Sequence, residues 1–152
     1  MNIYLVKQSR PDLGNATREL SKRMQKADPE QRDGLLGLIK FALDTEGAKL
    51  VIEPMPLNET KGMWFIKALC DCGFATDESR KSVTGFMVYF CGVLVAWKSK
   101  MQKHVTISTT EGEYVSISEV SCEILFVWHI AKDMGINVTL PIIVNVDNEG
   151  AI

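Results

Sequence analysis

One long amphipathic segment limits what this chain can fold into. Between positions 109 and 134, apolar residues recur every three or four positions, which predicts a helix with one buried stripe. These residues are Ile117, Val120, Ile124, Val127, Trp128 and Ala131. Ser108 and Glu111 have the spacing of a capping box at the start of this helix. The residues upstream are therefore expected to build a sheet on which the helix packs.

Two glutamates in the first turns of this helix have different interpretations. Glu111 is explained by capping, whereas Glu113 lies four residues before Ile117, on the stripe that faces the core. A carboxylate in that position costs free energy unless a cation or hydrogen-bond donors meet it. If Thr110 were the N-cap instead of Ser108, Glu113 would be the capping acid, and this alternative stays open at this stage.

Composition narrows the class of protein. The 152 residues are 46% hydrophobic and 24% charged, as in soluble globular proteins. No apolar run approaches the roughly 20 residues that span a bilayer, and the N-terminus lacks a signal peptide, so we expect an intracellular protein with no membrane partner. The net charge of −2 leaves nucleic-acid binding to a local patch. The candidate patch consists of Lys98, Lys100, Lys103 and His104, with a solvated strand end as the alternative explanation.

The first third of the chain predicts two packed helices. One begins at Asp12, and a second begins at Pro29, with Asp28 as its N-cap and an end near Glu46 and Gly47. Residues 49–53 are expected to form a short strand. Residues 56–62 predict a turn-rich linker, so the expected division is a helical segment at 1–55 and a second domain at 63–152.

The second part of the chain favours strands. Residues 64–70 predict a central strand buried on both faces and ending at Asp71, and residues 85–91 and 93–97 continue it as an antiparallel meander. After the long helix, residues 141–146 predict a fourth strand that ends at Asp147. A strand reached through a helix usually runs parallel to its neighbour. If it lies beside the first strand, Asp71 and Asp147 emerge at the same edge of the sheet.

Three carboxylates are therefore expected to converge: Asp71, Glu113 and Asp147. Each aspartate alone would more often be a turn residue or a helix cap. Together they would repel one another unless cations lay between them, which predicts hard divalent ions, magnesium first and manganese as the alternative. Two such ions can activate water and stabilise the leaving oxygen in phosphodiester cleavage. The combination indicates a nuclease.

Five short motifs follow one another along the chain. They are Cys70-Asp-Cys-Gly-Phe-Ala75, Arg80-Lys-Ser-Val-Thr-Gly-Phe86, Val95-Ala-Trp-Lys-Ser-Lys100, Ser108-Thr-Thr-Glu-Gly-Glu-Tyr114 and Val146-Asp-Asn-Glu-Gly-Ala-Ile152. In this order and spacing they resemble the ribonuclease H domain of copia-type LTR retrotransposon Pol polyproteins. Upstream, the segments at 10–12, 18–21 and 38–45 are similar to the connection between the reverse transcriptase and that domain.

The resemblance implies an α/β, ribonuclease H-like fold, C-terminally truncated, with an antiparallel three-strand meander plus a parallel strand. It makes Asp71, Glu113 and Asp147 the first three catalytic, metal-binding carboxylates. The implied activity is two-metal hydrolysis of the RNA strand of RNA–DNA hybrids, in the cytoplasm or in virus-like particles. The implied partner, besides the hybrid, is the rest of the reverse-transcriptase polyprotein, from which residues 1–55 would be a connection segment.

Departures from the family pattern support a different reading. The family's fourth acidic ligand would fall beyond Ile152, and Gly112 stands where alanine is common, which weakens the helix by up to about 1 kcal/mol. The alternative is therefore a non-catalytic retrotransposon remnant, or a module that binds nucleic acid or protein. Integrases carry a similar acidic triad, but the order of motifs favours ribonuclease H.

Overall fold

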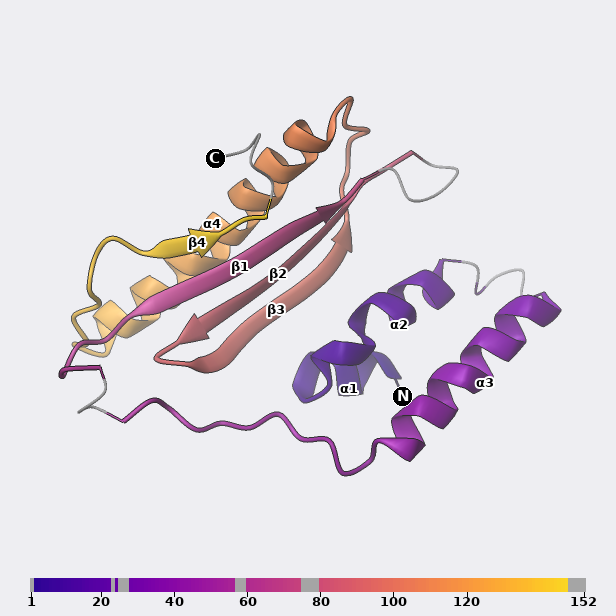
Figure 1. The fold of residues 1–152 in the computed structure, drawn as a ribbon, viewed down its shortest axis with the longest axis horizontal. Helices are drawn as coiled ribbons and strands as arrows, with labels where there is room; N and C mark the ends of the chain where they lie inside the picture. The colour runs from indigo at the N-terminus through magenta and orange to yellow at the C-terminus, as the bar shows by residue number, and fades with distance from the viewer. Residues whose placement is uncertain (1, 23, 25–27, 57–59, 75–79, 148–152) are drawn as a thin grey trace. The chain divides into compact units, whose positions relative to one another are not determined.

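The computed structural model describes residues 2–22, 24, 28–56, 60–74 and 80–147 (Figure 1). The chain divides into two compact units, Met1–Val51 and Ile52–Ile152, each of which is described by itself. Three parts of the sequence interpretation lie outside the described residues. These are positions 57–59 of the expected linker, the end of the first motif together with the connection at 75–79, and the last five residues of the final motif at 148–152.

The first unit is helical. Its elements are α1 (Asn2–Gln8), the 3₁₀ turn η1 (Pro11–Leu13), α2 (Gly14–Ser21) and α3 (Pro29–Asp44). The predicted start of α3 is confirmed, because the Asp28 carboxylate accepts a hydrogen bond of 2.8 Å from the amide of Gln31. Helix α1 was not predicted. Residues 49–53 form no strand, so the short strand expected there is wrong.

Arg10 connects η1 to the end of α3. Its guanidinium donates to the Asp12 carboxylate at 2.8 Å, to the Thr45 carbonyl at 3.1 Å and to the Thr45 hydroxyl at 2.7 Å. The hydrogen bond from Arg10 also lowers the pKa of Asp12. This pairing joins the start of η1 to the C-cap of α3.

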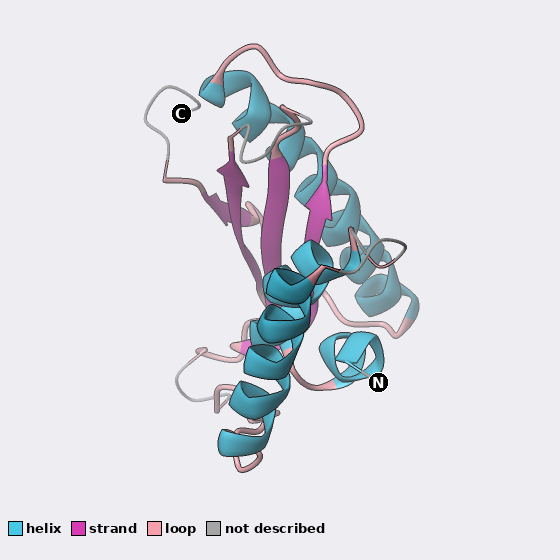
Figure 2. Ribbon diagram, turned by 90° about the vertical axis from the view of Figure 1, so that its right-hand side faces the viewer, coloured by secondary structure: helices cyan, strands magenta, loops and turns pink. Residues whose placement is uncertain are grey.

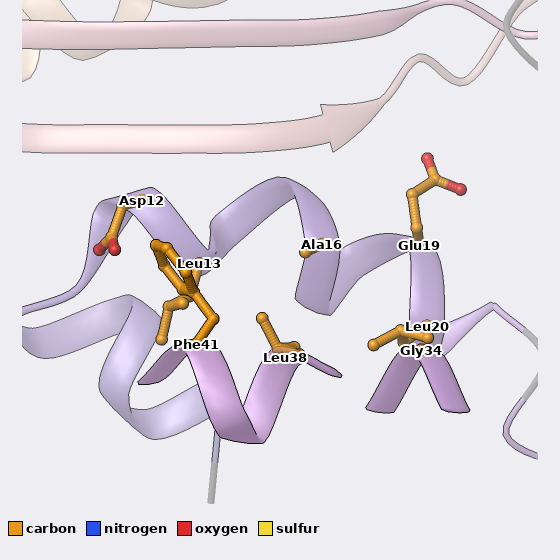
Figure 3. Close-up of a pocket in the computed structure, with 8 residues that line it drawn as sticks. All are labelled: Asp12, Leu13, Ala16, Glu19, Leu20, Gly34, Leu38 and Phe41. Atoms are coloured by element: carbon orange, nitrogen blue, oxygen red, sulfur yellow. The ribbon is translucent and has the colours of Figure 1, made fainter. Parts of the chain in front are cut away.

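A shallow groove of about 440 Å³ lies between the η1–α2 segment and α3 (Figure 3). Its walls are mostly apolar and include Leu13, Leu20, Leu38 and Phe41. Its two acidic residues already have cationic partners. Asp12 pairs with Arg10, and Glu19 pairs with Lys22 at 2.9 Å. The groove therefore offers packing surface and no unpaired acid.

The second unit is a four-stranded mixed sheet with one long helix. It contains β1 (Ile66–Gly73), β2 (Val83–Phe90), β3 (Val93–Met101), α4 (Thr109–Asp133) and β4 (Ile143–Asn145). The strand order is β3-β2-β1-β4, with antiparallel pairs except for β1 and β4, which are parallel. The α/β class, the antiparallel meander and the parallel fourth strand are confirmed. Figure 2 shows the strands, in magenta, running alongside the long helix.

Helix α4 closes the core against one face of the sheet. Its Val120 and Ile124 pack on Ile66, Ala68 and Val88, all of them buried. By length and composition alone α4 would also suffice to cross a membrane. Because α4 packs against the sheet and carries the buried Glu113, we interpret its apolar character as that of a core helix in a folded unit.

Strand β1 differs from the prediction in two respects. It alternates between buried and exposed residues, with Leu69 38% exposed, so burial on both faces is wrong. It also continues past Asp71, because Asp71, Cys72 and Gly73 pair with Gly85, Thr84 and Val83 of β2. Asp71 therefore lies within the strand, where the ladder to β2 fixes its backbone.

Candidate metal centre

The structure brings the three predicted carboxylates together. Asp71, Glu113 and Asp147 each offer an oxygen, and these oxygens all lie within 4.8 Å of one another. Parallel pairing explains the approach of the two aspartates. Leu69 of β1 lies opposite Asn145 of β4, and each aspartate comes two residues later in its own chain segment. Glu113 reaches them from the second turn of α4.

The cap of α4 determines which glutamate faces the centre. The Ser108 hydroxyl accepts a hydrogen bond from the amide of Glu111 at 3.1 Å, and the Glu111 carboxylate accepts from the amide of Ile107 at 2.6 Å. Ser108 is thus the N-cap and Glu111 the capping acid, which excludes the alternative with Thr110 as the cap. The carboxylate of Glu111 reaches one residue further back than the standard box predicts.

Glu113 is a buried carboxylate whose hydrogen bonding is incomplete. Its side chain is 4% exposed, and its Oε2 atom has no hydrogen-bond partner. Burial raises its pKa, the charges of Asp71 and Asp147 raise it further, and a hydrogen bond from the backbone of Cys72 opposes the change. Burial and the same three carboxylates raise the pKa of the Cys70 thiol to about 11. The carboxylates therefore disfavour the ionised form of Glu113 when no cation lies between them.

The donor set fits a hard divalent cation. Three carboxylates supply oxygen ligands of the kind that magnesium and manganese bind, and the unpartnered Oε2 of Glu113 is the atom that a cation would satisfy. Asp71 and Asp147 are exposed, so the centre is open to solvent on their side.

A buried polar layer beneath the centre was missed by the sequence analysis. The Gln102 amide donates to the Gly112 carbonyl at 3.0 Å and to the Thr84 hydroxyl at 3.1 Å, and the Ser116 hydroxyl lies 3.1 Å from the same carbonyl. Beside them, the hydroxyls of Ser82 and Thr106 lie 2.7 Å apart. The available signal was the presence of polar residues, such as Thr84, at inward positions of an otherwise apolar strand.

Gly112 packs against β1 more closely than any other residue could. A Cβ atom at this position would lie 2.5 Å from the Cys72 sulfur. The low helix propensity of glycine is therefore outweighed here by the room that it leaves for Cys72, which is a reason the sequence did not reveal.

The basic cluster lies at the same end of the sheet. Lys98 and Lys100 are in β3, and Lys103 and His104 are exposed in the loop that leads to α4. Lys100 lies opposite Thr84, which lies opposite Cys72, so two strand spacings of about 5 Å each separate it from β1. Lys100 forms an ion pair of 3.3 Å with Glu119 of α4.

Comparison with curated proteins identifies relatives of the chain. The chain is 27% identical over 139 residues to the retrovirus-related Pol polyprotein from transposon TNT 1-94 of Nicotiana tabacum, and 29% identical over 145 residues to that from transposon RE1 of Arabidopsis thaliana. The matches cover 89% and 94% of the chain, which spans about a tenth of the length of these relatives, 10% and 9%. The chain is thus homologous to a segment of copia-type retrotransposon Pol polyproteins.

A relative of similar size shows which family the chain belongs to. Secreted RxLR effector protein 161 of Plasmopara viticola is 30% identical over 129 residues, a match that covers 80% of this chain and 82% of that protein. The chain belongs to the same family as that protein. Secretion and an effector role are named for the Plasmopara viticola protein alone. No protein-family model and no solved structure matches the chain.

Proposed function

We propose that this chain carries the ribonuclease H step of a copia-type reverse transcriptase, on a ribonuclease H-like fold. The reaction would be hydrolysis of the RNA strand of an RNA–DNA hybrid. The observation that carries the proposal is the convergence of Asp71, Glu113 and Asp147, of which Glu113 is buried and has an Oε2 atom without a hydrogen-bond partner. The choice of an RNA–DNA hybrid as substrate is supported by homology to Pol polyproteins. The family resemblance implies that such polyproteins contain a reverse transcriptase, which makes such hybrids.

In this proposal Asp71, Glu113 and Asp147 hold magnesium, or manganese in its place. The ions would supply positive charge for the phosphate oxygens on which negative charge develops during hydrolysis. Asp71 is held by the β1–β2 ladder and Glu113 by the buried face of α4, so both are oriented before a substrate arrives. The exposed sides of Asp71 and Asp147 face the space that the scissile phosphate would enter.

The first experiment is cleavage of a labelled RNA–DNA hybrid by the purified chain in magnesium. We expect the RNA strand to be cut, and Asp71→Asn to reduce the rate by at least about 100-fold, because one of three charges that hold the ions is removed. Glu111→Gln is the matched control, since its cap is retained and its rate should stay unchanged. A folded chain that leaves the hybrid intact with either metal would refute the proposed activity and favour the alternative of a non-catalytic remnant.

The basic cluster is proposed to contact the phosphate backbone of the hybrid. Lys103 has no ion pair among the described residues, whereas Lys100 is partly neutralised by Glu119. Log affinity falls with log salt concentration, and the steepness of this fall counts the phosphate contacts. We therefore expect Lys103→Ala to make the slope shallower by about 1, and Lys100→Ala to change it less. Fluorescence anisotropy of a labelled hybrid at several salt concentrations measures both slopes. Equal slopes for the parent chain and Lys103→Ala would remove Lys103 from the contact surface.

The proposed setting follows from the same homology. The relatives are large polyproteins, so the rest of such a polyprotein is the proposed partner, and the first unit is proposed as the connection from the reverse transcriptase. The proposed location is the cytoplasm or virus-like particles. Co-purification with the reverse-transcriptase segment of the same element would test the partnership.

A further inference from the structure

The side chain of Gln102 joins three elements of the second unit. It is 2% exposed, and its Nε2 atom lies 3.0 Å from the Gly112 carbonyl of α4, 3.1 Å from the Thr84 hydroxyl of β2 and 3.7 Å from the Cys72 sulfur of β1. The backbone of Gln102 is itself fixed, because its amide donates to the Ser82 carbonyl at 2.8 Å. The amide group therefore reaches α4 from a rigid base on the sheet.

Two of these contacts adjoin the carboxylates. The Gly112 carbonyl belongs to the peptide group whose nitrogen is that of Glu113, and peptide groups are planar. A hydrogen bond that holds this carbonyl therefore also fixes the peptide plane that contains the nitrogen and the Cα atom of Glu113, to which its side chain is attached. On the strand side, Cys72 follows Asp71 directly, and Thr84 is the residue paired with Cys72.

The hydroxyl of Ser116 contacts the same two oxygens as Gln102 does, from within α4. The Ser116 Oγ atom lies within reach of both the Gly112 carbonyl, at 3.1 Å, and the Thr84 hydroxyl, at 3.2 Å. The Thr84 hydroxyl can donate to Ser116 Oγ while Ser116 donates to the Gly112 carbonyl, so this pair also links α4 to β2. The two amide protons of Gln102 reach the same two oxygens from the segment that follows β3. Gln102 thus adds a second link, from the end of β3, to the one that Ser116 and Thr84 form between α4 and β2.

We infer that Gln102 is a positioning residue of the carboxylate centre, which fixes the start of α4 on β1 and β2 and so sets the separation between Glu113 and Asp71. As far as metal binding is concerned, the inference rests on the proposed function. Its structural part, the fixing of the Gly112–Glu113 peptide, does not.

The test compares Gln102→Met with the parent chain, because methionine has a similar length and no donor. Isothermal titration with manganese should show affinity about tenfold weaker in the variant, as for other residues that orient metal ligands. In the metal-free protein, hydrogen exchange at the amides of residues 113–116 should be faster, and exchange near Ile124 unchanged. Thr84→Val, which removes the strand-side acceptor at nearly constant volume, should weaken manganese binding in the same direction and serves if Gln102→Met does not fold.

Val88→Ala is the matched control, because Val88 belongs to the apolar cluster under α4, and its truncation leaves a cavity there while every residue of the polar layer is kept. It should lower stability while manganese affinity stays within about twofold of the parent chain, since no metal-orienting contact is lost. If Val88→Ala weakens binding as much as Gln102→Met does, or if Gln102→Met binds manganese as the parent does, the positioning role is refuted. If the parent chain binds no manganese, the proposed function fails, and hydrogen exchange alone decides the inference: unchanged exchange at residues 113–116 overturns it.

Discussion

Glu113→Gln is expected to stabilise the metal-free chain, by about 1–3 kcal/mol at neutral pH, while removing its response to magnesium. The Glu113 carboxylate is buried, its Oε2 atom lacks a hydrogen-bond partner, and the negative charges of Asp71 and Asp147 repel it. The substitution replaces it by a neutral group of the same shape. Magnesium should raise the melting temperature of the parent chain and leave that of the variant nearly unchanged. Urea unfolding and thermal unfolding, each with magnesium and with a chelator, measure the two effects.

The stability difference should also depend on pH in a defined direction. Burial, together with the neighbouring carboxylates, raises the pKa of Glu113 in the folded state above its ordinary value of 4.5. The folded state then holds more protons than the unfolded state, so this group's contribution is fully present below pH 4.5 and is lost as the pH rises through the raised pKa. The advantage of Glu113→Gln over the metal-free parent should therefore be small below that pH and grow above it.

Glu111→Gln is the matched control for both measurements. It makes the same chemical change two residues earlier, where the glutamate is exposed and accepts a cap hydrogen bond that glutamine also accepts. Its stability should change little at any pH. A metal-free Glu113→Gln chain that is less stable than the parent at neutral pH would show that the Glu113 carboxylate has a favourable partner, contrary to the interpretation of the centre as a cation site.

The parts of this fold that the sequence predicted are those set by neighbours along the chain. The stripe from Ile117 to Ala131 and the caps at Ser108 and Asp28 depend on residues three or four positions apart, so their pattern is visible without a structure. The parallel placement of β4, and with it the approach of Asp147 to Asp71, followed from the general geometry of strand–helix–strand connections.

The parts that it did not predict depend on contacts between distant segments. An apolar run such as that of β1 does not reveal whether a second layer covers it, so the exposure of Leu69 was not foreseen. The extension of β1 beyond Asp71 depends on pairing with Val83–Gly85, and local spacing does not reveal the register of two strands. The layer around Gln102 draws its members from separate strands and from α4, and no local spacing relates them.

Gly112→Ala should destabilise the chain by about 1–3 kcal/mol, although alanine favours helices. The added methyl carbon would lie 2.5 Å from the Cys72 sulfur, which forces either the cysteine to rotate or the first turns of α4 to move away from β1. Gly37→Ala in α3 is the matched control, since a Cβ there meets no atom within 4 Å. That variant should gain up to about 1 kcal/mol from helix propensity. Urea unfolding of both variants measures the contrast.

A second substitution distinguishes the clash from other causes. Cys72→Ala removes the sulfur that the new methyl group meets, so the double variant Cys72→Ala/Gly112→Ala should recover about 0.5–3 kcal/mol relative to the sum of the single changes. Because Gly112 precedes Glu113, the single Gly112→Ala change should also weaken manganese binding, and the double change should restore it. Additive single changes would mean that α4 does not press on Cys72, and that the close approach of this helix to β1 is not what sets Glu113 beside Asp71.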